Sequence, residues 1–254
     1  MNIVVPVKLV PDLVEELTID ASGAALDTSW LRTIINEFDE HAIEQAILLK
    51  EREGGQVTVI ALDAEGIDDI LYTAAAKGAD HLVKLVASAG APANNHALAR
   101  ALEPVLRELQ PDLILTGVQA HNELDGPLGP LLAEALDMPY VGYVAGAGLT
   151  SGSITLRKEY PGGLVAEMEM KLPGVLGIQA AEKPPRYVAV SRVRQAMQSA
   201  KIEARPVGEV DAAGGLAPSR MFQPEPSERA KILDGDVEHV AEKLVEILRD
   251  AGVM

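Results

Sequence analysis

Residues 113–139 read LILTGVQAHNELDGPLGPLLAEALDMP, and this stretch contains the signals that decide the fold. The apolar run 113–115 predicts a buried strand, which Thr116 and Gly117 close. A polar loop that contains glycine follows, and apolar residues then recur at helical spacing from Leu131 to Leu136. A strand that ends in a loop before a helix can hold a phosphate on the free N–H groups of that helix. The stretch contains neither G-x-G-x-x-G nor G-x-x-x-x-G-K-[ST], so an ordinary strand–helix connection is the alternative interpretation.

Strand and helix signals alternate along the chain before this stretch. Short apolar and β-branched runs predict buried strands at residues 3–7, 56–62 and 81–86. Apolar residues at helical spacing predict helices that run up to Lys50 from an N-cap at Asn36, from Ile67 to Ala76, and from Asn94 to Leu109. This repeated alternation predicts an α/β fold with a mostly parallel, doubly wound sheet.

Ligands bind such a sheet outside the carboxyl ends of its strands, where the strand order switches. Three connections qualify as parts of a binding site: the loop 8–12 after Val7, the loop after Leu62 and the loop after Thr116. The helix start at Asn36 qualifies as well. Whether these segments meet depends on the strand order, which one sequence does not specify.

The sequence changes character after Pro139. Three short strands separated by glycine-rich turns are expected at residues 140–147, 153–160 and 165–172, as a short antiparallel extension, and residues 175–180 are expected to return to the main sheet. Residues 203–234 are rich in Pro, Gly and charge and are expected to form an arm without its own core, followed by an amphipathic helix at 236–251. We therefore expect a nucleotide-binding α/β domain at 1–203 and an extended C-terminal arm with a terminal helix at 204–254.

The composition excludes several classes of function. A net charge of −16 in 254 residues disfavours nucleic acid and anionic membrane surfaces as partners. Without cysteine there is no disulfide, no thiolate nucleophile and no cysteine-held metal or Fe–S site. No apolar run approaches membrane-spanning length, so no membrane insertion is expected, and the cytoplasm is the expected location. The five histidines have no metal-ligand spacing and no G-x-S-x-G occurs, so the sequence predicts neither a metal site nor a catalytic residue.

Six blocks, in order, are similar to the β subunit of electron transfer flavoproteins. They read VPVKLVPD (5–12), INEFDEHAIEQAILLKE (35–51), LTGVQAHNELDGPLGPLLAEALDMP (115–139), RKEYPGG (157–163), EMKLPGVLGI (169–178) and EKPPRY (182–187). Their order and spacing resemble the family from residue 1 to about residue 203.

This resemblance implies a domain of the adenine-nucleotide α-hydrolase type with flavodoxin-like layering. It implies an electron carrier rather than an enzyme, one that pairs with an α subunit holding most of the FAD site. The β subunit would itself hold AMP or, in electron-bifurcating members, a second FAD. A flavin dehydrogenase would donate the electrons, and a quinone reductase or another acceptor would receive them. The alternative is a stand-alone regulatory module of the stress-protein kind that binds an adenine nucleotide. An enzyme that activates a substrate with ATP should show a Gly-Ser-rich loop after the first strand, and KLVPD is not one.

The resemblance also carries over residue roles. The nucleotide contacts fall on Pro6, Asn36, Glu37, Phe38, Asp39, Leu62, Gly117, Val118, Gln119, Ala120, Asp125, Gly126, Pro127, Leu128 and Gly129. Glu159 matches a glutamate near the flavin of the α subunit. Residues 190–201 match the loop that recognises the dehydrogenase, with Val190 as the apolar anchor and Arg192 and Arg194 as its basic residues.

The nucleotide loop departs from the family pattern. AMP-binding members read N-Q-T-G where this chain has GPLG at 126–129, so Leu128 replaces a threonine whose hydroxyl would contact phosphate. Loss of such a hydrogen bond costs about 1.5–3 kcal/mol. Leu128-Gly129-Pro130 is closer to the V-G-P of bifurcating members, but Glu123 and Asp125 would repel a diphosphate unless their side chains turn outward. These features favour AMP slightly over a second FAD.

Overall fold

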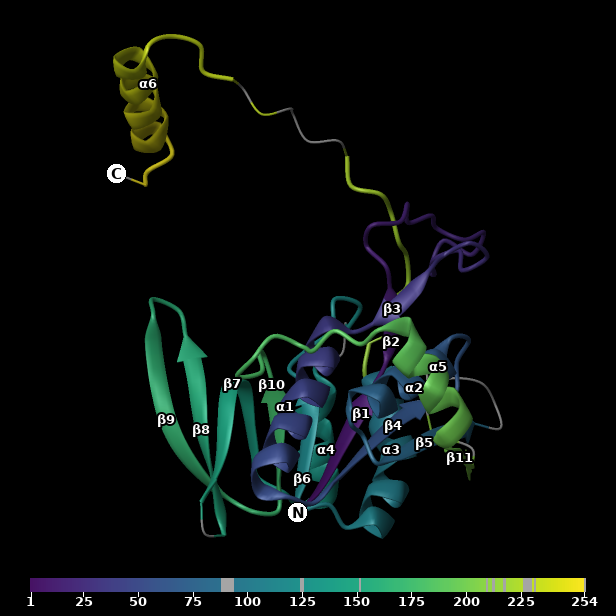
Figure 1. Cartoon of the computed structure of the whole chain (residues 1–254). Helices are drawn as coiled ribbons and strands as arrows, with labels where there is room; N and C mark the ends of the chain where they lie inside the picture. The colour runs from purple at the N-terminus through teal and green to yellow at the C-terminus, as the bar shows by residue number, and fades with distance from the viewer. Residues whose placement is uncertain are drawn as a thin grey trace. The chain divides into compact units, whose positions relative to one another are not determined.

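Alternating strands and helices form the N-terminal part of the chain, as the sequence predicts (Figure 1). The structure, a computed structural model, describes residues 1–87, 94–123, 126–150, 152–208, 210, 211, 213–216, 218–225, 230 and 232–253. These residues form two compact units, Met1–Arg220 and Met221–Met254. The elements of the first unit are β1 (Asn2–Val7), β2 (Leu9–Pro11), β3 (Thr33–Ile35), α1 (Glu37–Glu53), β4 (Gln56–Leu62), α2 (Ile67–Lys77), β5 (His81–Ala87), α3 (Asn95–Leu109), β6 (Leu113–Gly117), α4 (Leu128–Leu136), β7 (Tyr140–Thr150), β8 (Ser153–Tyr160), β9 (Leu164–Lys171), β10 (Gly174–Ile178), α5 (Val190–Ser199) and β11 (Ile202–Val207).

The main sheet has the order β11-β5-β4-β1-β6-β10-β7-β8-β9 in the described part of the chain. Neighbouring strands from β11 to β7 pair in parallel, whereas β8 pairs with β7 and with β9 in antiparallel fashion. The predicted fold class, a mostly parallel doubly wound sheet with a short antiparallel extension, is confirmed. Residues 174–178 do return to the main sheet, where β10 lies between β6 and β7.

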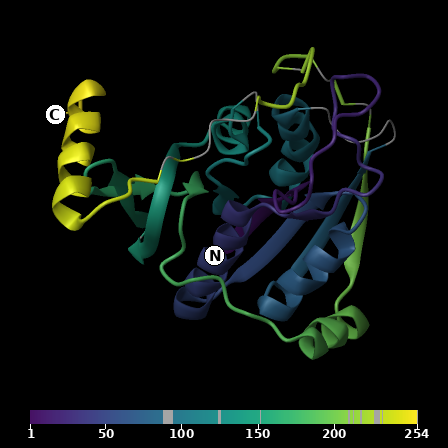
Figure 2. The same cartoon turned by 90° about the horizontal axis from the view of Figure 1, so that it is seen from above.

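Two hydrophobic layers cover the two faces of this sheet. Along β1, Ile3 and Val5 pack into the layer that contains α1 and α2, whereas Val4 packs into the layer that contains α3 and α4. This alternation follows from the two-residue period of a strand, and both layers are aliphatic. Figure 2 shows helices on both sides of the sheet.

The strand order switches direction at β1. The chain moves from β1 to β4 and β5 on one side, and α3 then carries it back to β6 on the other side of β1. The carboxyl ends of β1 and β6 therefore lie next to each other, which is the position where open α/β sheets bind ligands.

Several expected elements differ from the observed ones. The loop predicted at 8–12 contains β2, which pairs with β3 in a separate two-stranded sheet. The arm predicted from residue 203 begins with β11 instead, which pairs in parallel with β5, and the compact unit continues to Arg220. Pro206 and the charged residues of β11 hide this strand in the sequence, but an edge strand tolerates both.

The second unit contains α6 (Val237–Asp250), which agrees with the predicted terminal helix. The Asp236 carboxylate caps it by accepting a hydrogen bond from the His239 N–H at 2.9 Å. Its apolar residues lie on one face, and none of its residues is buried in the described structure. None of the described helices combines the length and apolarity needed to span a membrane.

The Asp39 carboxylate joins three elements at the switch point. Asp39 lies in the first turn of α1 and is 4% exposed. Its Oδ2 accepts a hydrogen bond from the Lys8 N–H after β1 at 3.0 Å, and its Oδ1 accepts one from the Gly117 N–H at the end of β6 at 2.9 Å. Burial raises the pKa of Asp39 to about 6, although Lys8 and the hydrogen bonds oppose this rise.

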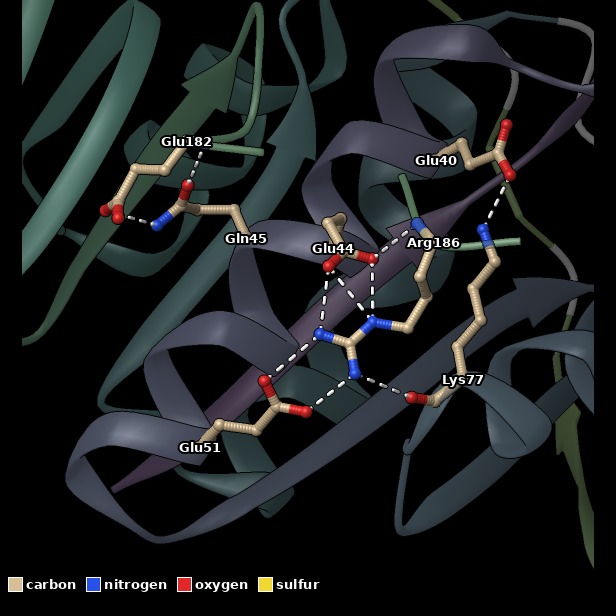
Figure 3. A network of polar contacts seen from close by, with 7 residues as sticks. All are labelled: Glu40, Glu44, Gln45, Glu51, Lys77, Glu182 and Arg186. Carbon is tan, nitrogen blue, oxygen red and sulfur yellow. Dashed lines mark hydrogen bonds and ion pairs between the residues drawn. The ribbon is translucent and has the colours of Figure 1, made fainter. Parts of the chain in front are cut away.

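A second polar network fixes the segment between β10 and α5 on the surface of α1 (Figure 3). The Arg186 guanidinium contacts Glu44 at 2.9 Å and Glu51 at 2.6 Å, and the Arg186 N–H donates to Glu44 at 2.9 Å. The Glu182 N–H donates to the side chain of Gln45 at 3.0 Å. Because Glu44 is buried, Arg186 compensates a charge that would otherwise lie in the interior. The network thereby holds the segment that leads into α5 against α1.

We expect the pH dependence of stability to change when Asp39 is replaced by Asn. A folded-state pKa of about 6, above the ordinary 3.8, means that the folded chain binds the proton more readily than the unfolded chain. The stability contributed by Asp39 is thus largest at acid pH and is lost as pH rises through about 6. The difference in free energy of unfolding between the native chain and Asp39→Asn should fall by about 2 kcal/mol from about pH 4.5 to about pH 7.5, as measured by urea denaturation. Asp69→Asn, at an exposed aspartate of α2, controls for the lost charge, and a pH-independent difference for Asp39→Asn would contradict the expectation.

Replacing Arg186 with Met should destabilise the chain by about 2–3 kcal/mol, because the Glu44 carboxylate stays buried without its cation. Arg32→Met is the matched control. Arg32 is exposed and lies 3.9 Å from Asp12, so its loss should cost less than about 1 kcal/mol. Equal losses in the two variants, measured by urea denaturation, would show that Arg186 is not a structural anchor.

Candidate functional site

The loop after β6 lies at the switch point and is held there by three contacts, two from the start of α1 and one from β10. Asp39 binds the Gly117 N–H, and the Asn36 side chain donates from Nδ2 to the Gln119 carbonyl at 3.0 Å. On the other side, the Val118 N–H donates to the Ile178 carbonyl at the end of β10 at 2.9 Å. The start of α1 and the loop after β6 thus meet, as strand order at a switch point permits.

Asn36 occupies the N-cap position of α1, as predicted. Its side chain accepts no capping hydrogen bond, however, and donates to the Gln119 carbonyl instead. Asn36 is 3% exposed, so its side-chain amide is a buried polar group whose hydrogen bond to Gln119 offsets the cost of burial.

Gly117 permits the close approach between the loop and α1. A Cβ atom at this position would lie 2.8 Å from the Phe38 Cβ and 2.9 Å from the Asn36 Nδ2, and it would also collide with the Asp39 carboxylate. Each of these atoms belongs to a buried or partly buried side chain. Any side chain at position 117 would therefore separate the loop from the helix start.

Lys8 and Asn95 belong to the site, although the sequence did not single them out. The Lys8 ammonium forms an ion pair with the Glu123 carboxylate and lies 3.4 Å from the Asn95 Oδ1. The Asn95 Nδ2 donates to the Gly126 carbonyl at 2.6 Å, and the Glu123 Oε2 accepts from the Ala120 N–H at 2.8 Å. Glu123 therefore points into the loop. The outward orientation that a bound diphosphate would require is not observed.

The start of α4 offers backbone groups rather than side chains. Pro127 is the N-cap residue, no side chain caps the helix, and its first turn contains no acidic residue. The side chain of Leu128 is buried in the layer that contains α3 and α4. Leu128 can therefore contribute only its backbone to a ligand in this structure.

The Tyr140 side chain packs against the start of α4 at Gly129. Its ring lies against three glycines, and a Cβ atom at Gly129 would lie 2.8 Å from the ring and 2.8 Å from the Thr116 hydroxyl. A Cβ atom at Gly142 would lie 2.6 Å from the Tyr140 hydroxyl, and one at Gly177 would also collide with it. Burial raises the pKa of Tyr140 to about 12, and the nearby Tyr143 and Glu123 add to this rise. A substitution at Gly129 would therefore disturb packing as well as any ligand.

The other predicted nucleotide residues are distributed as follows. Pro6 is buried within β1, opposite Ile60 of β4, and Leu62 is the partly buried last residue of β4. Glu37 and Gln119 are exposed, Ala120 is buried, and Gly126 is exposed with a φ of +89°. Asp125 lies outside the described residues.

The residues predicted to face protein partners lie elsewhere. Glu159 is on β8, which β10 and β7 separate from β6, and its carboxylate lies 3.6 Å from the Arg157 guanidinium. Val190, Arg192 and Arg194 are exposed on α5, which packs against α2 (Figure 1). Among the residues that the structure describes, no three His, Asp or Glu side chains gather closely enough to hold a metal ion.

Comparison with known proteins gives one consistent family. Residues 25–210 match the family model of the electron transfer flavoprotein domain. The chain is 28% identical to the electron transfer flavoprotein subunit beta of Methylophilus methylotrophus, over 98% of each chain, and 29% identical to that of Thermoanaerobacterium thermosaccharolyticum, over 100% of each chain. It is 33% identical to the subunit beta of Clostridium acetobutylicum, over 76% of this chain and 74% of the relative. The switch-point loop, α5 and every strand of the main sheet except β1 lie within residues 25–210, and the relatives cover nearly the whole chain. The chain therefore belongs to the electron transfer flavoprotein family, among the β subunits.

Proposed function

We propose that this chain carries electrons as one half of a heterodimer, with an α subunit that holds the FAD and with an adenosine phosphate at its own switch-point loop. The observation that carries the proposal is the family match over residues 25–210, which spans this loop, the β8–β9 hairpin and α5. Electron transfer needs cofactors held in place but no nucleophile or general base on this chain, which is consistent with the site.

The geometry of the loop supports an adenosine phosphate as its ligand. The loop lies at the carboxyl ends of β1 and β6, beside the uncapped start of α4, where N–H groups and the helix dipole favour an anion. A single phosphate fits the charges better than a diphosphate, since Asp39 and Glu123 already place two carboxylates around Lys8. AMP is therefore the proposed ligand, and a second FAD is the alternative.

The exposed surface of the β8–β9 hairpin supports an α subunit as the partner. β9 is an edge strand, and Leu164 and Val165 are 68% and 54% exposed. On β8, the Lys158 ammonium lies 5.2 Å from the ring centre of Tyr160 and 5.8 Å from that of Tyr143. Exposed apolar and aromatic side chains beside an open sheet edge are typical of a surface that another chain covers.

The surface of α5 supports a dehydrogenase as a second partner. Val190 is 62% exposed at the first turn of α5, and Arg192 and Arg194 give this surface positive charge in a chain of net charge −16. The Arg186 network anchors the segment that leads into α5. The helix is thus fixed at its base and open on its outer face, as a docking element requires.

Co-expression with the α subunit of the same genome tests the function. We expect a yellow complex with one copy of each chain, from which heat releases FAD and AMP that mass spectrometry identifies. Release of FAD alone, at two per complex, would keep the carrier function and replace AMP by a second FAD. A colourless homodimer that binds ATP and ignores the α subunit would instead support the stand-alone regulatory module.

Replacing Val190 with Asp should reduce electron transfer from the dehydrogenase to the complex at least about tenfold, because a charge at the apolar anchor must be desolvated on docking. The flavin content of the complex should stay unchanged. Leu216→Asp, at an exposed apolar residue outside α5, is the matched control and should transfer electrons at the native rate. An undiminished rate in Val190→Asp would exclude this residue as an anchor.

A further inference from the structure

Two hydrogen-bond donors in the loop converge on one internal carboxylate. The Lys8 ammonium contacts the Glu123 Oε1, and the Ala120 N–H donates to the Glu123 Oε2 at 2.8 Å. The side chains of Lys8 and Glu123 are 18% and 8% exposed, so this ion pair is largely shielded from water. Both oxygens of Glu123 are therefore engaged inside the loop.

These donors are the kind that bind a phosphate. A lysine ammonium is a common point-charge ligand of phosphate, and a backbone N–H in a turn after a strand is another. Lys8 follows β1, and Ala120 lies in the loop after β6, so the neighbouring carboxyl ends of these two strands bring the donors together. Asn95 reinforces the arrangement, because it lies 3.4 Å from the Lys8 ammonium and donates to the Gly126 carbonyl just before α4.

The carboxylates of Asp39 and Glu123 already compensate the positive charge of Lys8, so an additional anion would be repelled. The Asp39 carboxylate lies near Lys8 and is held by backbone N–H groups, so it does not move away without breaking the joint between β1, α1 and β6. Glu123, in contrast, follows the exposed residues His121 and Asn122 in a loop. A phosphate placed beside Lys8 would face two carboxylates unless Glu123 leaves.

We propose that Glu123 is an internal competitor for the phosphate of the bound adenosine nucleotide: its carboxylate fills the anion position formed by Lys8 and the Ala120 N–H, and the phosphate must displace it. This inference rests on the proposed function of the loop as a nucleotide site. Without nucleotide, Glu123 occupies the donors of Lys8 and Ala120, and it thereby lowers the affinity for the nucleotide. The identity of residue 123 thus decides how tightly the nucleotide is held.

The variant Glu123→Gln, made in the full chain, tests whether the Glu123 carboxylate competes with the phosphate. Gln has the same shape but no charge, so calorimetric titration should show AMP binding at least about tenfold more tightly than to the native chain, a change of about 1.4 kcal/mol. The affinity for adenosine, which lacks the phosphate, should stay the same in both proteins. Glu134→Gln is the matched control, since it removes one exposed carboxylate from α4 without touching the loop, and should leave the AMP affinity unchanged.

A double variant separates competition from a general change in the loop. In Lys8→Met/Glu123→Gln the cation that receives the phosphate is absent, so the gain in AMP affinity should disappear. Circular dichroism checks that each variant is folded. A gain that survives the loss of Lys8 would overturn the proposal.

The remaining outcomes distinguish this inference from the proposed function. Equal AMP affinity in the native chain and in Glu123→Gln overturns the proposed competition by Glu123 but leaves the proposed nucleotide site intact. An equal gain for adenosine and AMP also overturns it, because the effect would not depend on phosphate. A gain with FAD instead of AMP supports displacement by a diphosphate. Failure of AMP, adenosine and FAD to bind any variant overturns both the inference and the nucleotide site.

Discussion

The buried carboxylate of Asp39 is the interaction on which the site depends. Its two oxygens hold backbone N–H groups from the ends of β1 and β6, while the residue itself belongs to α1. The burial that raises its pKa opposes ionisation, and the two N–H donors offset part of that cost. Gly117 makes the joint possible because no other residue lets the loop approach this closely. Without this joint, the loop after β6 would lose its direct connection to the end of β1 through α1.

The rest of the site suits a carrier of cofactors better than an enzyme. The side chains around the loop are paired with one another, as in the contacts of Lys8 with Glu123 and of Asn36 with Gln119. Paired groups give order at the site rather than reactivity, and an electron carrier needs its cofactor held in a fixed orientation. The surfaces proposed for partners lie outside this loop, on the β8–β9 hairpin and on α5. The fold thus places the proposed cofactor site at the centre of the sheet and the proposed partner surfaces on the β8–β9 hairpin and α5.

Periodicity explains what could be predicted from the sequence. Apolar runs and helical spacing indicate the strands of the parallel sheet other than β11 and the helices that connect them, since those patterns arise from burial on one or both faces. The family resemblance led to Gly117, Asn36 and Asp39. Lys8 and Asn95 were missed because a single polar residue has no periodic signal, and their meeting at the loop after β6 depends on strand order. The strand β11 was missed because an edge position relaxes the usual demands on composition.

We propose that an adenosine phosphate lies in the loop after β6, between the end of β1 and the start of α4. A crystal structure of the complex with the α subunit tests it most directly. We expect density for an adenosine phosphate in this loop, with its phosphate beside the Lys8 ammonium and the Glu123 side chain turned away. A complex with an ordered but vacant loop, and with every nucleotide bound in the α subunit, would contradict it.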